Sequence, residues 1–146
     1  MKVIHHVVDI DAKREVVWHA ITTRAGLAAW WTTEVAASPA VVGALIRFTF
    51  GGDFNPVMQI TKVDAGRSVE WKCIDGHAPW ADNTFAFGLE HADNHTRLRF
   101  TQNYATELSD DQYGVYNFNW GYYLNSLDDY CKTGKGAPFD PAVSKV

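Results

Sequence analysis

The sequence is poor in the features that mark several classes of protein. Its two cysteines, Cys73 and Cys131, have no spacing typical of a metal site or a disulfide framework. No apolar run reaches the roughly 20 residues that a membrane-spanning helix needs. Basic residues do not outnumber acidic ones, and a net charge of −4 argues against non-specific nucleic-acid binding. The first residues lack the charged and apolar regions of a signal peptide. We therefore expect a cytoplasmic protein with no nucleic-acid partner and no membrane span.

Motifs of catalysis and metal binding are also scarce. The sequence has no Gly-x-Ser-x-Gly elbow, no Gly-rich phosphate loop and no paired-cysteine motif. His5 and His6 are adjacent on an expected strand, so they face opposite sides and cannot chelate one metal ion. His91 and His95 flank an expected hairpin turn without a third ligand, which favours two solvated side chains over zinc. We expect no catalytic residue, no metal and no cofactor.

Aromatic residues are what the chain has in excess. They make up 14% of its 146 residues and include six tryptophans. A chain of this length forms one domain with one core, and we take residues 1–146 as that domain. Because aromatic side chains contribute large area with specific geometry, so many of them indicate either a well-filled core or an aromatic-lined pocket.

The segment from Ser109 to Gly134 is predicted to be one long amphipathic helix. Ser109 and Gln112 have the spacing of a capping box, and Gly134 can adopt the left-handed conformation that ends a helix. Apolar residues recur at intervals of three and four, at Tyr113, Tyr116, Trp120, Leu124, Leu127 and Cys131. The second half of this stripe is typical of a core, whereas the aromatic first half could line a cavity.

The remaining chain predicts a sheet preceded by two short helices. A first strand covers 2–10, and its more apolar face, turned inward, carries Ile4, His6, Val8 and Ile10. Helical spacing follows at 13–23 and 24–31. The period then changes to two, with turn residues at each boundary, and predicts strands at 44–50, 57–63, 68–74, 83–90 and 96–104. An antiparallel sheet with one apolar face needs a cover, and the long helix is the only segment large enough. The fold class is therefore α+β.

Two segments resemble the signatures of one family. The first is the run from Val16 to Thr22 (VVWHAIT), followed by Leu27 and by the pair Trp30-Trp31; the second is Trp120-x3-Leu124-x2-Leu127-x2-Tyr130 with Gly134. They resemble the family similar to the activator of the 90-kDa heat-shock protein ATPase, within the START-like (SRPBCC) superfamily. This resemblance implies a helix-grip fold over the whole chain: a curved antiparallel sheet of about six strands around the C-terminal helix, with a hydrophobic cavity between them. It implies no reaction, because members of such superfamilies differ in function.

The cavity is the expected functional site, and its ligand a hydrophobic or aromatic small molecule. Pocket lining and core filling are equal alternatives for Trp30, Tyr113 and Tyr116, and His77 lies in a loop near the expected cavity mouth. The expected binding residues are Trp30, Trp31, Phe48, Trp71, Trp80, Phe85, Phe87, Phe100, Tyr113, Tyr116 and Trp120, with His6 and Gln102 as polar groups. A protein-interaction module of the chaperone-activator kind is the first alternative, and a cavity-based hydrolase or cyclase is the second. A homodimer is a further possible assembly.

Overall fold

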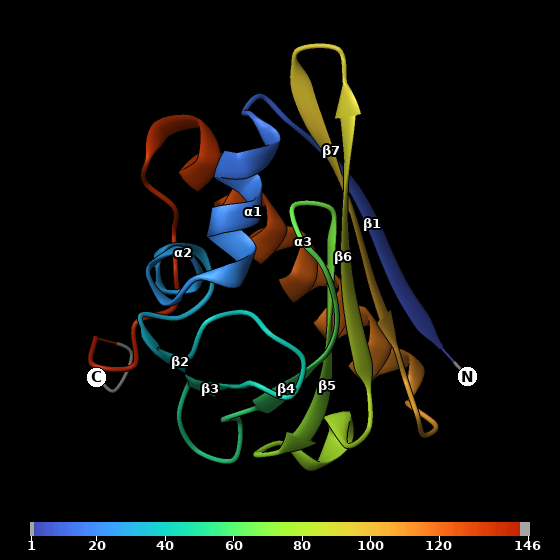
Figure 1. Ribbon diagram of the computed structural model, residues 1–146. Coiled ribbons are helices and arrows are strands. Elements are labelled where there is room, and N and C mark those ends of the chain that lie inside the picture. The colour runs from blue at the N-terminus through green and yellow to red at the C-terminus, as the bar shows by residue number, and fades with distance from the viewer. Residues whose placement is uncertain (1, 144–146) are drawn as a thin grey trace.

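A computed structural model describes residues 2–143 and shows a curved sheet that holds a long helix on its concave side (Figure 1). All seven strands belong to one antiparallel sheet with the order β1-β7-β6-β5-β4-β3-β2. The elements are β1 (Val3–Ile10), α1 (Arg14–Thr22), α2 (Arg24–Trp30), β2 (Glu34–Ala37), β3 (Leu45–Thr49), β4 (Val57–Asp64), β5 (Ser68–Asp75), the 3-10 helix η1 (Ala78–Trp80), β6 (Thr84–Ala92), β7 (His95–Asn103) and α3 (Asp110–Thr133). The predicted α+β helix-grip fold is confirmed.

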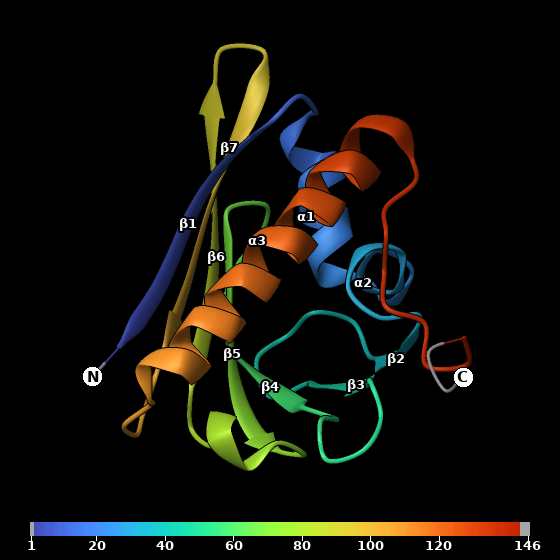
Figure 2. The ribbon, with the colours of Figure 1, turned by 180° about the vertical axis from the view of Figure 1, so that it is seen from behind.

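Helix α3 has the termini that its sequence predicts. The Ser109 side chain accepts a hydrogen bond from the backbone N–H of Gln112, and the Gln112 side chain accepts one from the backbone N–H of Ser109, which completes the capping box. Gly134 ends the helix with a φ of 83°. Figure 2 shows α3 crossing the concave side of the sheet, with α1 and α2 beside its C-terminal half. The α3 residues Trp120, Leu124 and Leu127 are buried.

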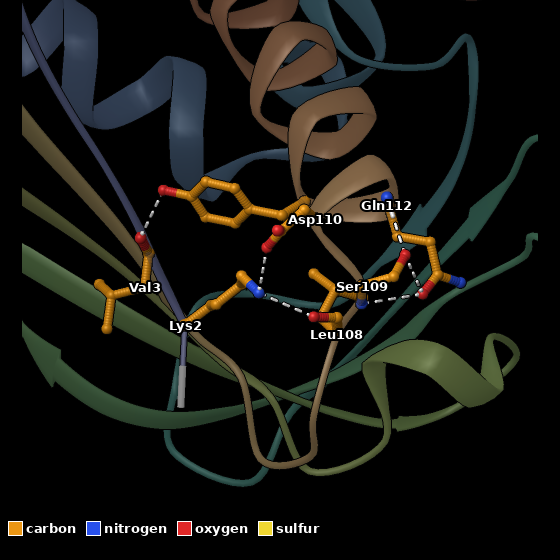
Figure 3. Close-up of polar contacts among 7 residues, drawn as sticks. Lys2, Val3, Leu108, Ser109, Asp110 and Gln112 are labelled. Atoms are coloured by element: carbon orange, nitrogen blue, oxygen red, sulfur yellow. Dashed lines mark hydrogen bonds and ion pairs between the residues drawn. The ribbon is translucent and has the colours of Figure 1, made fainter.

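The start of α3 is fastened to β1 by polar contacts (Figure 3). The Lys2 ammonium donates to the carbonyl oxygen of Leu108 and lies 2.9 Å from the carboxylate of Asp110. The Tyr113 hydroxyl donates to the carbonyl oxygen of Val3 over 3.1 Å. These contacts hold the first turn of the helix against one margin of the sheet, and the rest of α3 crosses the sheet diagonally (Figure 2).

The sheet carries its apolar side chains toward the helices. Alternate residues of β5, β6 and β7 are buried, as the period of two predicts. In β1 the predicted inward face is confirmed, because Ile4 and Ile10 are fully buried whereas Val3 and Val7 are exposed. No helix within residues 2–143 has the length and hydropathy to cross a bilayer.

The expected number of about six strands was too low by one. Strand β2 runs from Glu34 to Ala37 and pairs with β3, its Val35 opposite Phe48. Four residues, two of them alanine, are too few to show an alternating pattern, so the pairing partner stabilises this strand rather than its own propensity. The chain after α3 returns along α2 to the start of β2, where the backbone of Phe139 forms hydrogen bonds of 2.9 Å with Trp31 and Thr33.

Candidate functional site

A cavity of about 370 Å³ lies between α3 and the end of the sheet where β3, β4 and β5 turn. Five separate parts of the chain line it: the end of α2, the loop between β3 and β4, the loop that contains η1, helix α3 and the C-terminal segment. Nine of its eleven lining residues carry rings; the set is Trp31, Phe50, Gly51, Phe54, His77, Trp80, Tyr116, Asn119, Trp120, Tyr123 and Phe139. The site is therefore almost wholly aromatic.

Three nearly parallel indoles form the deep wall of the cavity. The rings of Trp31, Trp80 and Trp120 lie 5.1–6.3 Å apart between centroids, with interplanar angles of 16–27°. All three side chains are 2–3% exposed. Parallel indole faces at one wall favour a flat ligand, because an aromatic ring gains most from an offset stack or an edge contact with another ring.

A buried amide holds one of these indoles in place. The Trp120 Nε1–H donates to Gln102 Oε1 over 2.8 Å, and Gln102 Nε2 donates to Asn83 Oδ1 over 2.9 Å. Gln102 and Asn83 are fully buried. Because β7 supplies the glutamine and the turn before β6 supplies the asparagine, the sheet sets the orientation of a ring that belongs to α3.

The mouth of the cavity has rings set across those indoles. Phe54 meets Trp80 at an interplanar angle of 84° and His77 at 75°. The Phe50 ring packs at a tilt against Phe54, 4.6 Å between centroids, and against Phe139, 5.4 Å between centroids. The loop between β3 and β4 and the C-terminal segment thus close the cavity from one side.

A neutral histidine and a tyrosine are the main polar pair at the mouth. His77 Nδ1 lies 3.3 Å from the carbonyl oxygen of Asp53, which can only accept, so Nδ1 carries the proton. His77 Nε2 therefore accepts from the Tyr116 hydroxyl, 2.9 Å away. Burial lowers the pKa of His77 and raises the pKa of Tyr116, so both groups are uncharged at neutral pH. The Tyr116 oxygen keeps free lone pairs and can accept a hydrogen bond from a ligand.

Charged side chains and metal-binding clusters are missing from this site. The lining holds no Lys, Arg, Asp or Glu among the residues that the structure describes. Over the same residues, 2–143, no group of three His, Cys, Asp or Glu side chains lies close enough to hold a metal ion. An ionised ligand group would thus enter a largely apolar space without a charged partner, which is costly.

Four of the thirteen predicted binding residues line the cavity, namely Trp31, Trp80, Tyr116 and Trp120. The others lie elsewhere. Trp30 stacks on Trp31, with 6.1 Å between ring centroids, but does not line the cavity, and its Nε1–H donates to the carbonyl oxygen of Ala20 over 2.9 Å. Tyr113 and His6 belong to the contact between β1 and α3, where His6 Nε2 lies 3.0 Å from Asn117 Oδ1. The remaining six are core residues, Phe48, Trp71, Phe85, Phe87, Phe100 and Gln102.

Sequence reasoning left seven lining residues out of the predicted set. Tyr123 and Asn119 follow Tyr116 at helical intervals of seven and three, so the stripe on α3 contains a signal for them. The sequence predicts His77 near the cavity mouth, but not as a binding residue. Phe50 ends the predicted strand 44–50, in phase with Phe48, so the period of two contains a signal for it. Gly51, Phe54 and Phe139 come from a loop and from the C-terminal segment, and no periodicity marks them.

Comparisons with known proteins agree with this architecture. The model of the family described as "Activator of Hsp90 ATPase homolog 1-like protein" matches residues 11–132. The solution structure of the Aha1 dimer from Colwellia psychrerythraea is 34% identical, with a TM-score of 0.83 over 93% of this chain and 100% of that one. No curated protein matches the sequence.

Two more distant structures show the fold alone. DynU16, a protein from the dynemicin biosynthetic locus, is 19% identical with a TM-score of 0.76, over 93% of this chain and 49% of that one. The protein SSP2350 from Staphylococcus saprophyticus is 17% identical with a TM-score of 0.74, over 93% of this chain and 96% of that one.

Proposed function

The chain belongs to the family of Activator of Hsp90 ATPase homolog 1-like proteins, and we propose that it binds a neutral aromatic small molecule between α3 and the sheet. Family membership supports a ligand-binding or interaction domain. The observation that favours a small ligand is the cavity itself, which is lined by nine rings. Its volume of about 370 Å³ lies at the lower end of the range for small-molecule sites.

The chemistry of the lining narrows the class of ligand. The three indoles favour a flat ring system, and the lack of a charged lining residue favours an uncharged one. The Tyr116 hydroxyl donates its hydrogen bond to His77, so its oxygen remains available to accept a hydrogen bond from a ligand. The ligand that fits best is therefore a planar aromatic with one hydroxyl or N–H donor.

A titration with three naphthalenes tests this proposal. We expect 2-naphthol to bind and to raise the melting temperature, because a ligand at a hundredfold excess over its Kd stabilises the folded state by about 2.7 kcal/mol. 2-Methoxynaphthalene lacks the donor and should bind about 2–10-fold more weakly, the cost of one hydrogen bond. Naphthalene-2-sulfonate should not bind, because its charge has no partner in the cavity. Calorimetry measures all three.

One substitution and its matched control locate the binding. Asn119 lines the cavity from an exposed position on α3, and Asn125 is exposed on the same helix away from the cavity. Asn119→Trp should abolish 2-naphthol binding with an unchanged melting temperature, whereas Asn125→Trp should leave both unchanged. Binding that survives Asn119→Trp, or no binding of any naphthalene to the parent protein, would contradict the proposal.

A protein-interaction role is the second candidate, favoured by the family and by an exposed apolar strip on α3. Val115, Phe118 and Tyr122 are 54–75% exposed there. Because the relative from Colwellia psychrerythraea is a dimer, we propose that this chain also forms a homodimer. We further propose a cytoplasmic location, since Cys73 and Cys131 are both free thiols.

A further inference from the structure

Strand β1 forms a long open margin of the sheet. It pairs with β7 on one side only, and its N-terminal half is the outermost part of the sheet on that side in both views (Figures 1 and 2). The opposite margin is β2, which has four residues and lies beside the backbone bonds between Thr33 and Phe139. β1 has eight residues, so it offers the larger surface for pairing.

The register shows which backbone groups of β1 are free. The carbonyl oxygen of Lys2 accepts from the N–H of Tyr104, so even-numbered residues of β1 bond to β7 and odd-numbered ones point away. The Tyr113 hydroxyl on the carbonyl oxygen of Val3 agrees with this alternation. The N–H and C=O groups of His5, Val7 and Asp9 therefore face outward from the sheet.

Apart from the Val3 carbonyl, which the Tyr113 hydroxyl occupies, this edge lacks the usual protection against pairing. Natural edge strands carry lysine, proline or a bulge that keeps other strands away. Within Val3–Ile10 there is no lysine and no proline, and its register with β7 runs without a break. A second strand can add here with regular antiparallel hydrogen bonds.

We propose that two copies of this chain pair through β1, antiparallel about a two-fold axis at Val7. This axis sets Val7 opposite Val7 of the partner subunit and His5 opposite Asp9 of the partner subunit. An axis at His5 would place His5 opposite His5 of the partner subunit. An axis at His6 would place His5 opposite Val7 of the partner subunit. Only the axis at Val7 sets a nitrogen donor opposite a carboxylate, twice in the dimer.

The side chains at both positions keep atoms that can make that contact. His5 Nδ1 lies 3.0 Å from Thr101 Oγ1 on the neighbouring strand, which leaves Nε2 available. The hydrogen bond from Arg97 to Asp9, 2.8 Å long, lowers the pKa of Asp9 and keeps it ionised. Arg97 donates to both oxygens of Asp9, over 2.8 Å and 3.2 Å, and His95 Nε2 lies 3.8 Å from Oδ1. Each carboxylate oxygen has two lone pairs, so Asp9 can still accept from a histidine across the interface.

The adjoining surface of α3 is apolar and open. Phe118, which is 75% exposed, directly follows Asn117, the residue that contacts His6 of β1. Gly114 lies one turn before Phe118, and a methyl group on its Cα would meet no other atom within 4 Å. A glycine inside a helix costs about 1 kcal/mol relative to alanine, and close approach of a second helix would account for its presence. Continuing the sheet across β1 would bring a second α3 to the same side.

A pair of charge variants tests the register as well as the surface. His5→Asp sets two acids against each other, and Asp9→Lys sets a lysine against a histidine. We expect each variant alone to dimerise about tenfold more weakly than the parent or worse, and an equimolar mixture to form a heterodimer. Native mass spectrometry separates the three species by mass. Homodimers of either variant at the parent's strength would overturn the assignment.

A second substitution tests the edge without reference to register. Val7→Lys introduces an edge lysine and should convert the dimer to monomer, with Val16→Lys on α1 as the matched exposed control. This inference rests on the proposed homodimer, and the outcomes separate the two. A monomeric parent protein contradicts both, whereas a dimer that withstands Val7→Lys contradicts the β1 interface alone.

Discussion

Replacing Gln102 with leucine removes the amide that joins Trp120 to the sheet. The Trp120 Nε1–H and the Asn83 Oδ1 then lose partners that lie 2.8 Å and 2.9 Å from the Gln102 amide. Each buried polar group left without a partner costs about 1–3 kcal/mol, so the change should cost about 2–6 kcal/mol of unfolding free energy. Near 150 residues, each kcal/mol corresponds to roughly 2–4 °C in melting temperature.

Denaturant titration of the parent, two single variants and the double variant measures this contribution. Trp120→Phe removes the donor, so adding it to Gln102→Leu should cost less than the sum of the two single changes. Gln102→Leu should also weaken 2-naphthol binding, because the Trp120 ring loses its fixed orientation. A Gln102→Leu variant with the stability of the parent, or strict additivity in the cycle, would refute the role assigned to this amide.

Three further predictions concern other parts of the fold. Leu127→Ala should cost about 2–5 kcal/mol of unfolding free energy, because Leu127 is fully buried beneath α3; an unchanged denaturation midpoint would mean that α3 is not docked there. Burial lowers the folded-state pKa of His77, so its contribution is present above the unfolded value of about 6.5 and is lost as the pH falls below it. The melting temperature of the parent should then fall more steeply below that pH than the melting temperature of His77→Asn. If the two melting temperatures change in parallel with pH, this role of His77 is contradicted. Burial raises the pKa of Cys73, and that of Cys131 to about 12, so native thiol alkylation at pH 8 should be slow at both and fast in denaturant; rapid native labelling of either would be the opposing result.

Local signals in the sequence were enough for most of the fold. The capping box at Ser109, the left-handed Gly134 and the spacing between them define α3 within one residue at each end. Turn residues and a period of two locate five strands of the sheet and the inward face of β1. Strand β2 was missed because a four-residue strand depends on its partner β3, which lies beyond the reach of a local pattern.

Local signals were weaker for the site. They could identify an aromatic cavity between helix and sheet, but not which rings line it. Trp30 and Trp31 are adjacent in sequence and their rings stack, yet Trp30 bonds to α1 and only Trp31 lines the cavity. Phe139 reaches the cavity through backbone bonds to residues more than a hundred positions earlier. Gln102 is polar and faces inward as expected, but Trp120 and Asn83 satisfy it within the core.

One further difference concerns depth of burial rather than direction. Cys131 lies in the half of the α3 stripe that is typical of a core, and it packs against the core while remaining partly exposed. The spacing of apolar residues predicts the side of a helix that faces the core, but not how far a neighbouring element covers the margin of that side.

The indole N–H signals of the tryptophans test the central claim most directly. In a heteronuclear NMR titration with 2-naphthol, a ligand between α3 and the sheet must shift the signals of Trp31, Trp80 and Trp120. The signal of Trp18 should stay in place, because Trp18 lies in a separate groove beside α1 and the Ser38-Pro39 loop. Saturable shifts confined to the three cavity tryptophans are the predicted result. A shift at Trp18 alone, or no shift at any tryptophan, would contradict the account.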